Sequence, residues 1–436
     1  MDRSIANAIF ASFVLRLATG LTGGLLIYLL ADFPSYGGPE VSAAVVGGLT
    51  ALFFVGELGL SPVFGLLSDR VGYQRVMQLG PVFGVVAVVL TLAVIGPGAR
   101  MSEALVPMLV GSLPLLGLTR LLEGASTAAS VPSVLGYLAL ASSGDQRLRG
   151  RASSWFEAAT IAGLAAGLVA AGVLWAAMGP AGFIVNGAVY LGAWWIFQRR
   201  VPVLQRARGS PSTPGVRGRY GLLLRQPRVW LLAPTWIALN AALGLYTSQT
   251  LFQLVRSPDV RFADQLLVGG LEPLPATAAL LIGAVAFFGG LAYWGRRFAS
   301  VRRTTIIVIG LAGGVAFVIA TGLLNHLPAD AIALRLGAVG AMISGLFLLA
   351  GATPAALGLL ADTSESFPAD RGAVMGLYSV FLGLGQIVGA VVGAMAAENW
   401  ALDGVLGATI LLGVVAVLPL AHLRRFEIAL AEPGSA

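Results

Sequence analysis

Twelve apolar runs of membrane-spanning length follow one another along the chain and limit its fold more than any other feature. A helix needs about 20 apolar residues to cross the hydrocarbon core of a bilayer. The chain is 57% hydrophobic and only 11% charged, which excludes a soluble core of this length. We therefore predict an all-α polytopic membrane protein with twelve transmembrane helices, at roughly 7–31, 41–67, 76–96, 111–141, 152–176, 181–198, 229–254, 275–295, 304–324, 333–360, 372–396 and 402–423.

The Arg residues indicate how the spans are oriented. All 27 basic residues are Arg; 21 fall in loops on one side, four on the other, and Arg16 and Arg120 lie within spans. By the positive-inside rule, the Arg-rich side and both termini are cytoplasmic. We expect a multi-pass protein of the cell inner membrane or plasma membrane, with the lipid bilayer as its constant partner.

The composition also excludes several kinds of function. The chain has no Cys, which excludes disulfides and thiolate metal sites, and its two His residues are too isolated to form a metal site. No phosphate-binding loop motif is present, so ATP-driven transport and a bound cofactor are not expected. The Arg residues follow the loops and form no basic face, so the high pI does not indicate a nucleic-acid partner.

A linker rich in Arg, Pro, Gly and Ser divides the chain in the middle. It covers roughly 199–228 and separates a first group of six spans, 1–198, from a second group, 229–436. We predict two six-helix bundles joined by a cytoplasmic linker.

The loop between the second and third spans carries a charged motif in a chain that otherwise avoids charge. Its matching residues are Gly65, Asp69, Arg70, Gly72 and Arg75, in the pattern G-x-x-x-D-R-x-G-x-[RK]-[RK], while Gln74 stands where a basic residue is usual. Asp69 can accept hydrogen bonds at a helix N-terminus, the Arg side chains can bind headgroups or a carboxylate, and Gly permits a tight turn. This loop resembles that of the major facilitator superfamily. The resemblance implies two pseudo-symmetric bundles, alternating access by rocking, and a loop that latches the two halves.

Ionisable side chains within spans indicate where coupling chemistry could lie, because each costs about 2.5–3.5 kcal/mol to insert at a helix centre. Five stand out, all in the first half of the chain: Arg16, Glu57, Arg120, Glu123 and Glu157. Arg120 and Gly124 resemble the R-x-x-x-G motif of the family's fourth helix, which implies proton coupling. Arg120 and Glu123 are three residues apart, so mutual neutralisation is an equal alternative. We predict Arg16 with Glu157 as a structural pair, and Glu57 and Glu123 as rival proton carriers.

Glycines recur four residues apart in two spans, a pattern that favours close helix packing. Gly163 and Gly167 lie in the fifth span, where the exporters of the family have a Pro at the position of Leu168, a departure that weakens an antiporter assignment. We expect Gly385 and Gly389 of the eleventh span to pack against the second span.

The spans of the second half contain almost no charge but several amphipathic side chains away from the membrane interfaces. These candidate substrate-binding residues are Trp236, Asn240, Tyr246, Gln249, Tyr378, Phe381 and Gln386. A cavity lined in this way suits an apolar or amphipathic compound.

We therefore predict a secondary active transporter with the major facilitator fold, acting on a small molecule as a monomer. Proton-coupled export of a hydrophobic or amphipathic compound is the favoured function. A uniporter or symporter for a nutrient or metabolite is the alternative. A membrane-embedded lipid-modifying enzyme would need clustered His, Asp or Ser near one interface, which the sequence lacks.

Overall fold

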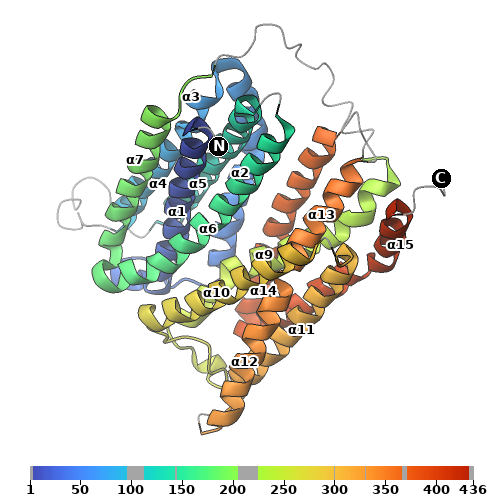
Figure 1. Cartoon of the computed structure of the whole chain (residues 1–436). Helices are drawn as coiled ribbons and strands as arrows, with labels where there is room; N and C mark the ends of the chain where they lie inside the picture. The colour runs from blue at the N-terminus through green and yellow to red at the C-terminus, as the bar shows by residue number, and fades with distance from the viewer. Residues whose placement is uncertain are drawn as a thin grey trace. The chain divides into compact units, whose positions relative to one another are not determined.

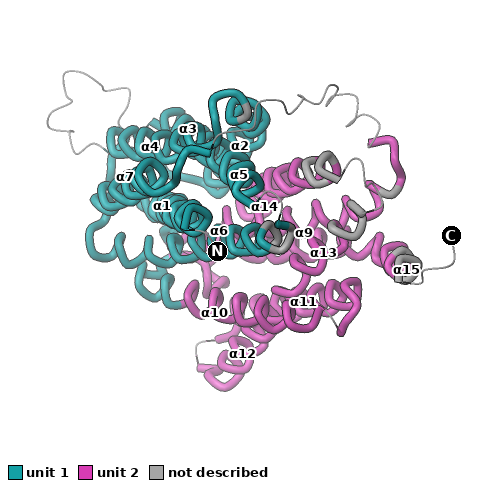
Figure 2. Tube along the Cα trace, turned by 45° about the horizontal axis from the view of Figure 1, so that its top comes forward, with its two compact units in different colours: residues 1–210, 255–257, 270–278 teal, residues 211–254, 258–269, 279–436 magenta. Residues whose placement is uncertain are grey.

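The computed structural model describes residues 3–95, 112–142, 145–204, 224–298, 300–328, 330–365 and 371–431. Every regular element in these ranges is a helix, as the apolar runs predict. The chain divides into two compact units, and the division near Ser210 falls inside the predicted linker. Residues 205–223 of that linker lie outside the described residues. Figure 2 colours the two units separately.

Unit 1 contains the helices of the first half of the chain, drawn from blue to green in Figure 1. Its helices are α1 (Arg3–Ala31), η1 (Phe33–Tyr36), α2 (Ala43–Val71), α3 (Tyr73–Met77), α4 (Leu79–Ile95), α5 (Leu113–Ala141), α6 (Gln146–Met178), η2 (Gly179–Ala181) and α7 (Gly182–Arg200). Ser42 and Ser112 cap α2 and α5, each accepting a hydrogen bond from the backbone N–H three residues on.

Two helix pairs form the framework of unit 1, α1 with α6 and α2 with α5. At Gly20 and Gly167 the backbones of α1 and α6 approach so closely that an added Cβ would overlap the facing backbone. Gly56 and Gly124 allow the same approach between α2 and α5. The predicted packing role of Gly167 therefore has a direct counterpart in the structure, because only Gly leaves room for backbone against backbone.

Unit 2 contains the second group of helices. They are α9 (Pro227–Val255), η3 (Val260–Phe262), α10 (Pro273–Arg297), α11 (Arg303–His326), α12 (Ile332–Leu349), α13 (Ala352–Glu365), α14 (Arg371–Val417) and α15 (Leu420–Ala431). Residues 255–257 and 270–278, which include the first turn of α10, group with unit 1. The hydroxyl of Tyr28 on α1 donates a hydrogen bond to the carbonyl of Pro273 in this segment at 3.4 Å.

The glycines of α14 pack against α9. A Cβ at Gly385 or Gly389 would meet the backbone of α9 at Ile237 and Ala241. The second span was therefore the wrong partner for these glycines. Because α9 and α14 carry small residues that face each other within unit 2, they form their own close contact there.

Among the described residues, ten helical segments are long and apolar enough to cross a membrane. Two of them, Arg151–Arg200 and Leu377–Arg425, contain 50 and 49 residues, about twice the length that one crossing needs. The first is interrupted by η2, and the second has a non-helical residue at Ala401, whose φ is 47°. Twelve crossings remain a prediction, and these two breaks lie where that prediction requires them.

Candidate functional site

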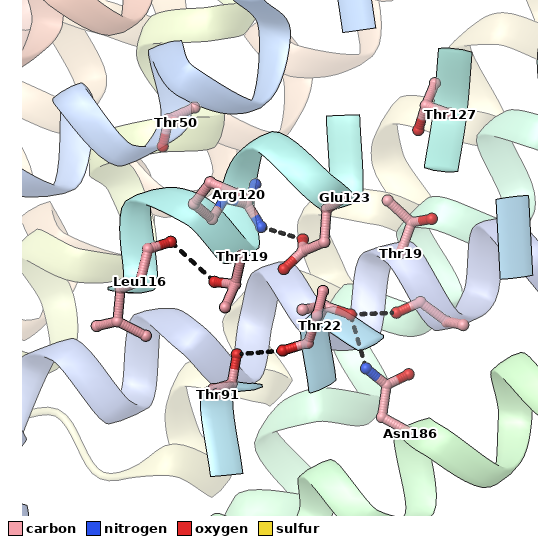
Figure 3. A network of polar contacts seen from close by, with 12 residues as sticks. Thr19, Thr22, Thr50, Thr91, Leu116, Thr119, Arg120, Glu123, Thr127 and Asn186 are labelled. Carbon is pink, nitrogen blue, oxygen red and sulfur yellow. Dashed lines mark hydrogen bonds and ion pairs between the residues drawn. The ribbon is translucent and has the colours of Figure 1, made fainter. Parts of the chain in front are cut away.

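A buried ion pair lies in the core of unit 1, on α5. The guanidinium of Arg120 donates a hydrogen bond to Oε2 of Glu123, one turn further along the same helix. Arg120 is 8% exposed and Glu123 is 1% exposed, and they are the two charged residues classed as buried among all those that the structure describes. Phe53 of α2 covers the guanidinium with its ring, 4.9 Å from centroid to Cζ. The contact between Arg120 and Glu123, which the three-residue spacing gave as one of two alternatives, is thus formed (Figure 3).

The ion pair satisfies only part of the Glu123 carboxylate. Its second oxygen, Oε1, is buried and has no hydrogen-bond partner among the described residues. A buried carboxylate normally accepts hydrogen bonds at both oxygens, since leaving one unpaired costs free energy. Glu123 therefore keeps a free acceptor position inside the bundle, available to a proton or a water molecule.

Hydroxyl and amide groups from α1 and α7 lie in the same core (Figure 3). The amide of Asn186 donates to the hydroxyl of Thr22 at 2.7 Å, and that hydroxyl lies 3.2 Å from the hydroxyl of Tyr190. Tyr190 in turn interacts electrostatically with both Glu123 and Arg120. We call Thr22, Asn186 and Tyr190 the polar cluster of unit 1.

The sequence analysis did not identify this polar cluster. Its one available signal is spacing, because Asn186 and Tyr190 are four residues apart and so share one face of the sixth span. A neutral polar residue in a span carries no strong indication of its role, and hydropathy alone gives no partner for it.

The close crossing of α2 and α5 sets the position of Glu57. A Cβ at Gly124 would overlap the carbonyl of Phe53 and lie 2.7 Å from the backbone nitrogen of Glu57. Glu57 and Glu123 therefore lie at the same level of the bundle, on the two helices that cross there. Glu57 is half-buried, whereas Glu123 is fully buried.

Arg16 of α1 interacts with the remaining acidic candidates. Its Nη1 donates to the hydroxyl of Thr127 on α5 at 3.0 Å. It interacts electrostatically with both Glu57 and Glu157. Among the described side chains no direct ion pair within 4.0 Å joins Arg16 to either acid. The predicted pairing of Arg16 with Glu157 alone therefore stays a prediction.

The motif loop follows the turn between α2 and α3. Gly72 has φ 99°, a conformation that favours Gly, and its N–H donates to the carbonyl of Ser68 to end α2. Arg70 and Arg75 are exposed, and a Cβ at Gly65 would face open space. The side chain of Asp69 lies outside the described side chains.

Gln74, the departure from the motif, has a specific contact. Its amide donates to the carbonyl of Val201 at 2.6 Å and to that of Phe197 at 3.4 Å. These carbonyls belong to the C-terminal end of α7, where the last four carbonyls of a helix lack partners within it. Gln74 therefore ties the motif loop to α7.

Three of the candidate substrate-binding residues lie in the apolar core of unit 2. Trp236, Tyr378 and Phe381 are 2%, 0% and 5% exposed and pack in one cluster. The indole N–H of Trp236 donates to the carbonyl of Tyr378, and the hydroxyl of Tyr378 donates to the carbonyl of Val229 at 2.6 Å. Because the polar atoms of Trp236 and Tyr378 already have backbone partners and Phe381 is apolar, this geometry favours helix packing for these three side chains.

The other four candidates lie along α9 and α14. Asn240 is buried and donates to the carbonyl of Trp236, and Gln249 is buried and accepts from the amide of Gln253 at 3.4 Å. Tyr246 is half-buried and its hydroxyl accepts from Thr409. Gln386 is half-buried, and its backbone contacts Gly244. Substrate binding by these residues stays a prediction, and Tyr246 and Gln386 are the two that are half-buried.

In the described part of the chain, no group of three or more His, Asp or Glu side chains is arranged to hold a metal ion.

Comparison with known proteins gives the family. A family model described as the Major Facilitator Superfamily matches residues 8–344. A crystal structure of the nucleoside transporter NupG is 13% identical, with 99% of this chain and 100% of that chain covered at a TM-score of 0.66. A crystal structure of a D-xylose-proton symporter is 16% identical, with 97% of each chain covered at a TM-score of 0.69. A search of curated protein sequences finds no match.

The family match confirms the assignment made from the motif loop, and the two structures confirm the fold. The match also agrees with a helical chain that carries ten long apolar segments among its described residues. The chain belongs to the Major Facilitator Superfamily and is a multi-pass membrane transporter, not an enzyme.

Proposed function

We propose that this transporter couples the movement of a small apolar or amphipathic compound to protons, and that Glu123 carries the proton. Export is the direction we propose. The observation that carries the proposal is the buried Arg120–Glu123 pair, in which one carboxylate oxygen is bound and the other has no partner in the described structure. An ionisable group held within the membrane is a candidate functional group because keeping it there is costly.

The geometry gives each member of the pair a role. Arg120 stabilises the ionised form of Glu123 by direct contact, and Phe53 stabilises the guanidinium from the other side. When a conformational change separates Arg120 from Glu123, the buried carboxylate loses its counter-charge and takes up a proton. The free position at Oε1 and the hydroxyls of the polar cluster offer a route by which that proton reaches it.

The structure favours Glu123 over Glu57 as the carrier. Glu123 contacts its Arg directly and is fully buried, while Glu57 is half-buried and has no ion pair within 4.0 Å in the described ranges. A group that gains and loses a counter-charge changes its proton affinity most when the contact is direct and water is excluded. Glu57 and Arg16 are then supporting charges at the same level of the bundle.

The test uses purified protein in proteoliposomes, after a thermal-shift screen has selected a transported compound. Glu123→Gln should abolish accumulation driven by a pH gradient while counterflow exchange and affinity for the compound stay near wild type. Glu57→Gln and Glu157→Gln are the matched controls, because each removes one acid of unit 1 that lies on α2 or α6. Protein yield is measured on the same preparations.

A purely structural pair gives a different result. Removing one partner of a buried pair then costs about 3–5 kcal/mol of stability, so Glu123→Gln would fold poorly and lose binding along with transport. Accumulation that survives Glu123→Gln would contradict the proposal. Accumulation lost only in Glu57→Gln would assign the proton to the other acid.

Proton symport is the second candidate, because one similar structure is that of a D-xylose-proton symporter. The direction of the pH gradient that drives uptake distinguishes proton symport from proton-coupled export. An exporter that exchanges protons for the compound loads liposomes whose lumen is acidic, whereas a symporter loads liposomes placed in an acidic medium. In either case the Glu123→Gln variant should respond to neither gradient.

A further inference from the structure

An open pocket of about 460 Å³ lies at the end of unit 1 where α1 begins and α7 ends. Three Arg side chains line it: Arg3 from α1, and Arg199 and Arg200 from the last turn of α7. Pro202 and Leu204 add an apolar wall. The pocket therefore combines three positive charges with a small apolar surface, and neither the transport cycle nor the coupling pair uses it.

The three positive charges have no acidic partner among the described side chains. Every ion pair within 4.0 Å in those ranges involves other residues. The next part of the chain, 205–223, contains four Arg and no Asp or Glu. Three guanidinium groups on one pocket repel one another, and an anion in the pocket would relieve that repulsion.

Hydrogen bonds hold the pocket in shape. The amide of Asn7 on α1 donates to the carbonyl of Arg200 at 2.9 Å, which fixes the two helix ends relative to each other. Gln74 on α3 donates to the carbonyls of Phe197 and Val201. Arg199 and Arg200 therefore lie at an end of α7 that accepts hydrogen bonds from both α1 and α3.

We propose that this pocket binds the phosphate of an anionic phospholipid headgroup. Guanidinium groups bind phosphate oxygens through paired, charge-assisted hydrogen bonds, and basic pockets between spanning helices suit anionic headgroups. The pocket lies at the ends of two membrane-spanning helices, close to Trp195, which is 48% exposed and whose ring lies 5.7 Å from Cζ of Arg200. An exposed Trp in the last turns of a span is typical of the membrane interface.

Free phosphate shares this chemistry, but the position favours lipid. Leu191 on α7 is 53% exposed, so an apolar surface leads from the pocket along the helix. Acyl chains can cover such a surface, and inorganic phosphate cannot. A headgroup in the pocket would connect Arg3 on α1 with Arg199 and Arg200 on α7.

The experiment titrates detergent-purified protein with phosphatidylglycerol and, separately, with phosphatidylcholine, and measures bound lipid by native mass spectrometry. The test variant is Arg199→Gln/Arg200→Gln. The matched control is Arg296→Gln/Arg297→Gln, which removes the same charge from the last turn of α10, where Arg297 also lies over an aromatic ring. The test variant should bind phosphatidylglycerol roughly thirtyfold more weakly, and the control should bind like wild type.

Arg3→Gln provides a second variant at an exposed position on the opposite wall, and it should weaken binding about fivefold. It keeps the proposal testable if the double variant folds poorly. Equal losses in the test and control variants would mean general charge attraction and would overturn the proposal. So would equal binding of the two lipids, or displacement of phosphatidylglycerol by inorganic phosphate at equal molar concentration.

Discussion

The two units bury different kinds of polar group. In unit 1 the buried groups include the charged Arg120 and Glu123, one turn apart in the middle of the bundle. In unit 2 the described buried polar side chains are neutral, such as Asn240 and Gln249. Charged contacts of unit 2 lie at helix ends instead, as where the carboxylate of Glu427 accepts hydrogen bonds from the backbone at the start of α11.

This difference indicates which polar groups are explained by stability and which need a functional explanation. A charged pair inside a bundle gains less free energy than well-packed apolar side chains of similar size, so packing alone gives no reason to keep it. Charges at helix ends pair with unsatisfied backbone groups and need no such explanation. Both units nevertheless join their helices in the same way, through Gly against backbone. We therefore expect unit 1 to respond to charge substitutions and both units to respond alike to packing substitutions.

The largest expected effect is from Arg120→Met, because it leaves the carboxylate of Glu123 buried without its counter-charge. We expect loss of transport, with a loss of stability below the about 3–5 kcal/mol of a broken structural pair, because Glu123 takes up a proton when its counter-charge is gone. The double variant Arg120→Met/Glu123→Leu should recover most of the stability, because no charge is then buried, but it should not recover pH-driven transport. Thermal unfolding in detergent and proteoliposome uptake measure the two effects.

A neutral substitution in unit 2 serves as the comparison. Asn240→Leu removes a buried amide that donates a hydrogen bond to the backbone carbonyl of Trp236, at a cost of about 1 kcal/mol. If Asn240→Leu were as damaging as Arg120→Met, the contrast between charged and neutral cores would be wrong. Recovery of transport in the double variant of unit 1 would contradict the coupling role.

The second expected effect tests what the units share. Gly124→Ala in unit 1 and Gly389→Ala in unit 2 each place a methyl group against a facing backbone carbonyl. Because backbone cannot move aside as a side chain can, each substitution should cost about 1–3 kcal/mol. Gly295→Ala is the control, since a Cβ there meets nothing within 4 Å. If only one of the two variants had a lower melting temperature than wild type, the two units would pack their helices by different means.

A smaller effect is expected for single hydroxyl groups. Tyr378→Phe leaves the buried carbonyl of Val229 without that donor and should cost about 1–2 kcal/mol, with transport unchanged. Tyr190→Phe removes a hydroxyl from the polar cluster, where Thr22 keeps its bond from Asn186. We expect it to cost less stability but to slow pH-driven transport. Transport that fails in Tyr378→Phe and not in Tyr190→Phe would move the functional site to unit 2.

The fold was accessible from the sequence because hydropathy is a local property. The described residues of the long apolar runs are mostly helical, although two runs share α14 and the run at 333–360 is divided between α12 and α13. Gly167 indicates close packing whatever its partner is. The partner of Gly389 was predicted wrongly because it depends on tertiary arrangement. The same applies to the second-half candidates. Whether Trp236 faces a cavity or its own core depends on helix rotation, and composition does not determine helix rotation.

Site residues could be predicted from the sequence only where their charge is unusual for a membrane span. Arg120 and Glu123 are unusual in a span, and their spacing alone predicts their contact. Asn186 and Thr22 come from helices far apart in sequence and have ordinary side chains, so their contact requires the structure. Gln74 shows the same limit, because in the sequence it is only a departure from the family motif, and its bonds to α7 require the structure.

The smallest expected effect concerns Gln74. The Gln74 amide donates a hydrogen bond to a carbonyl at the C-terminal end of α7. Carbonyls at a helix end need such a donor because of helix geometry, independently of the motif. The basic residue that the motif usually has at this position is also a donor. Gln74→Arg should therefore stay within about 0.5 kcal/mol of wild type, whereas Gln74→Leu, which removes the donor, should cost about 1 kcal/mol. The matched substitution in unit 2 is Arg303→Leu, which removes a donor to the carbonyl of Gly358 on α13. If Gln74→Arg and Gln74→Leu unfolded at the same temperature, hydrogen bonding would not explain the residue at this position. The uncharged Gln74 would then affect the protein through the net charge of the loop.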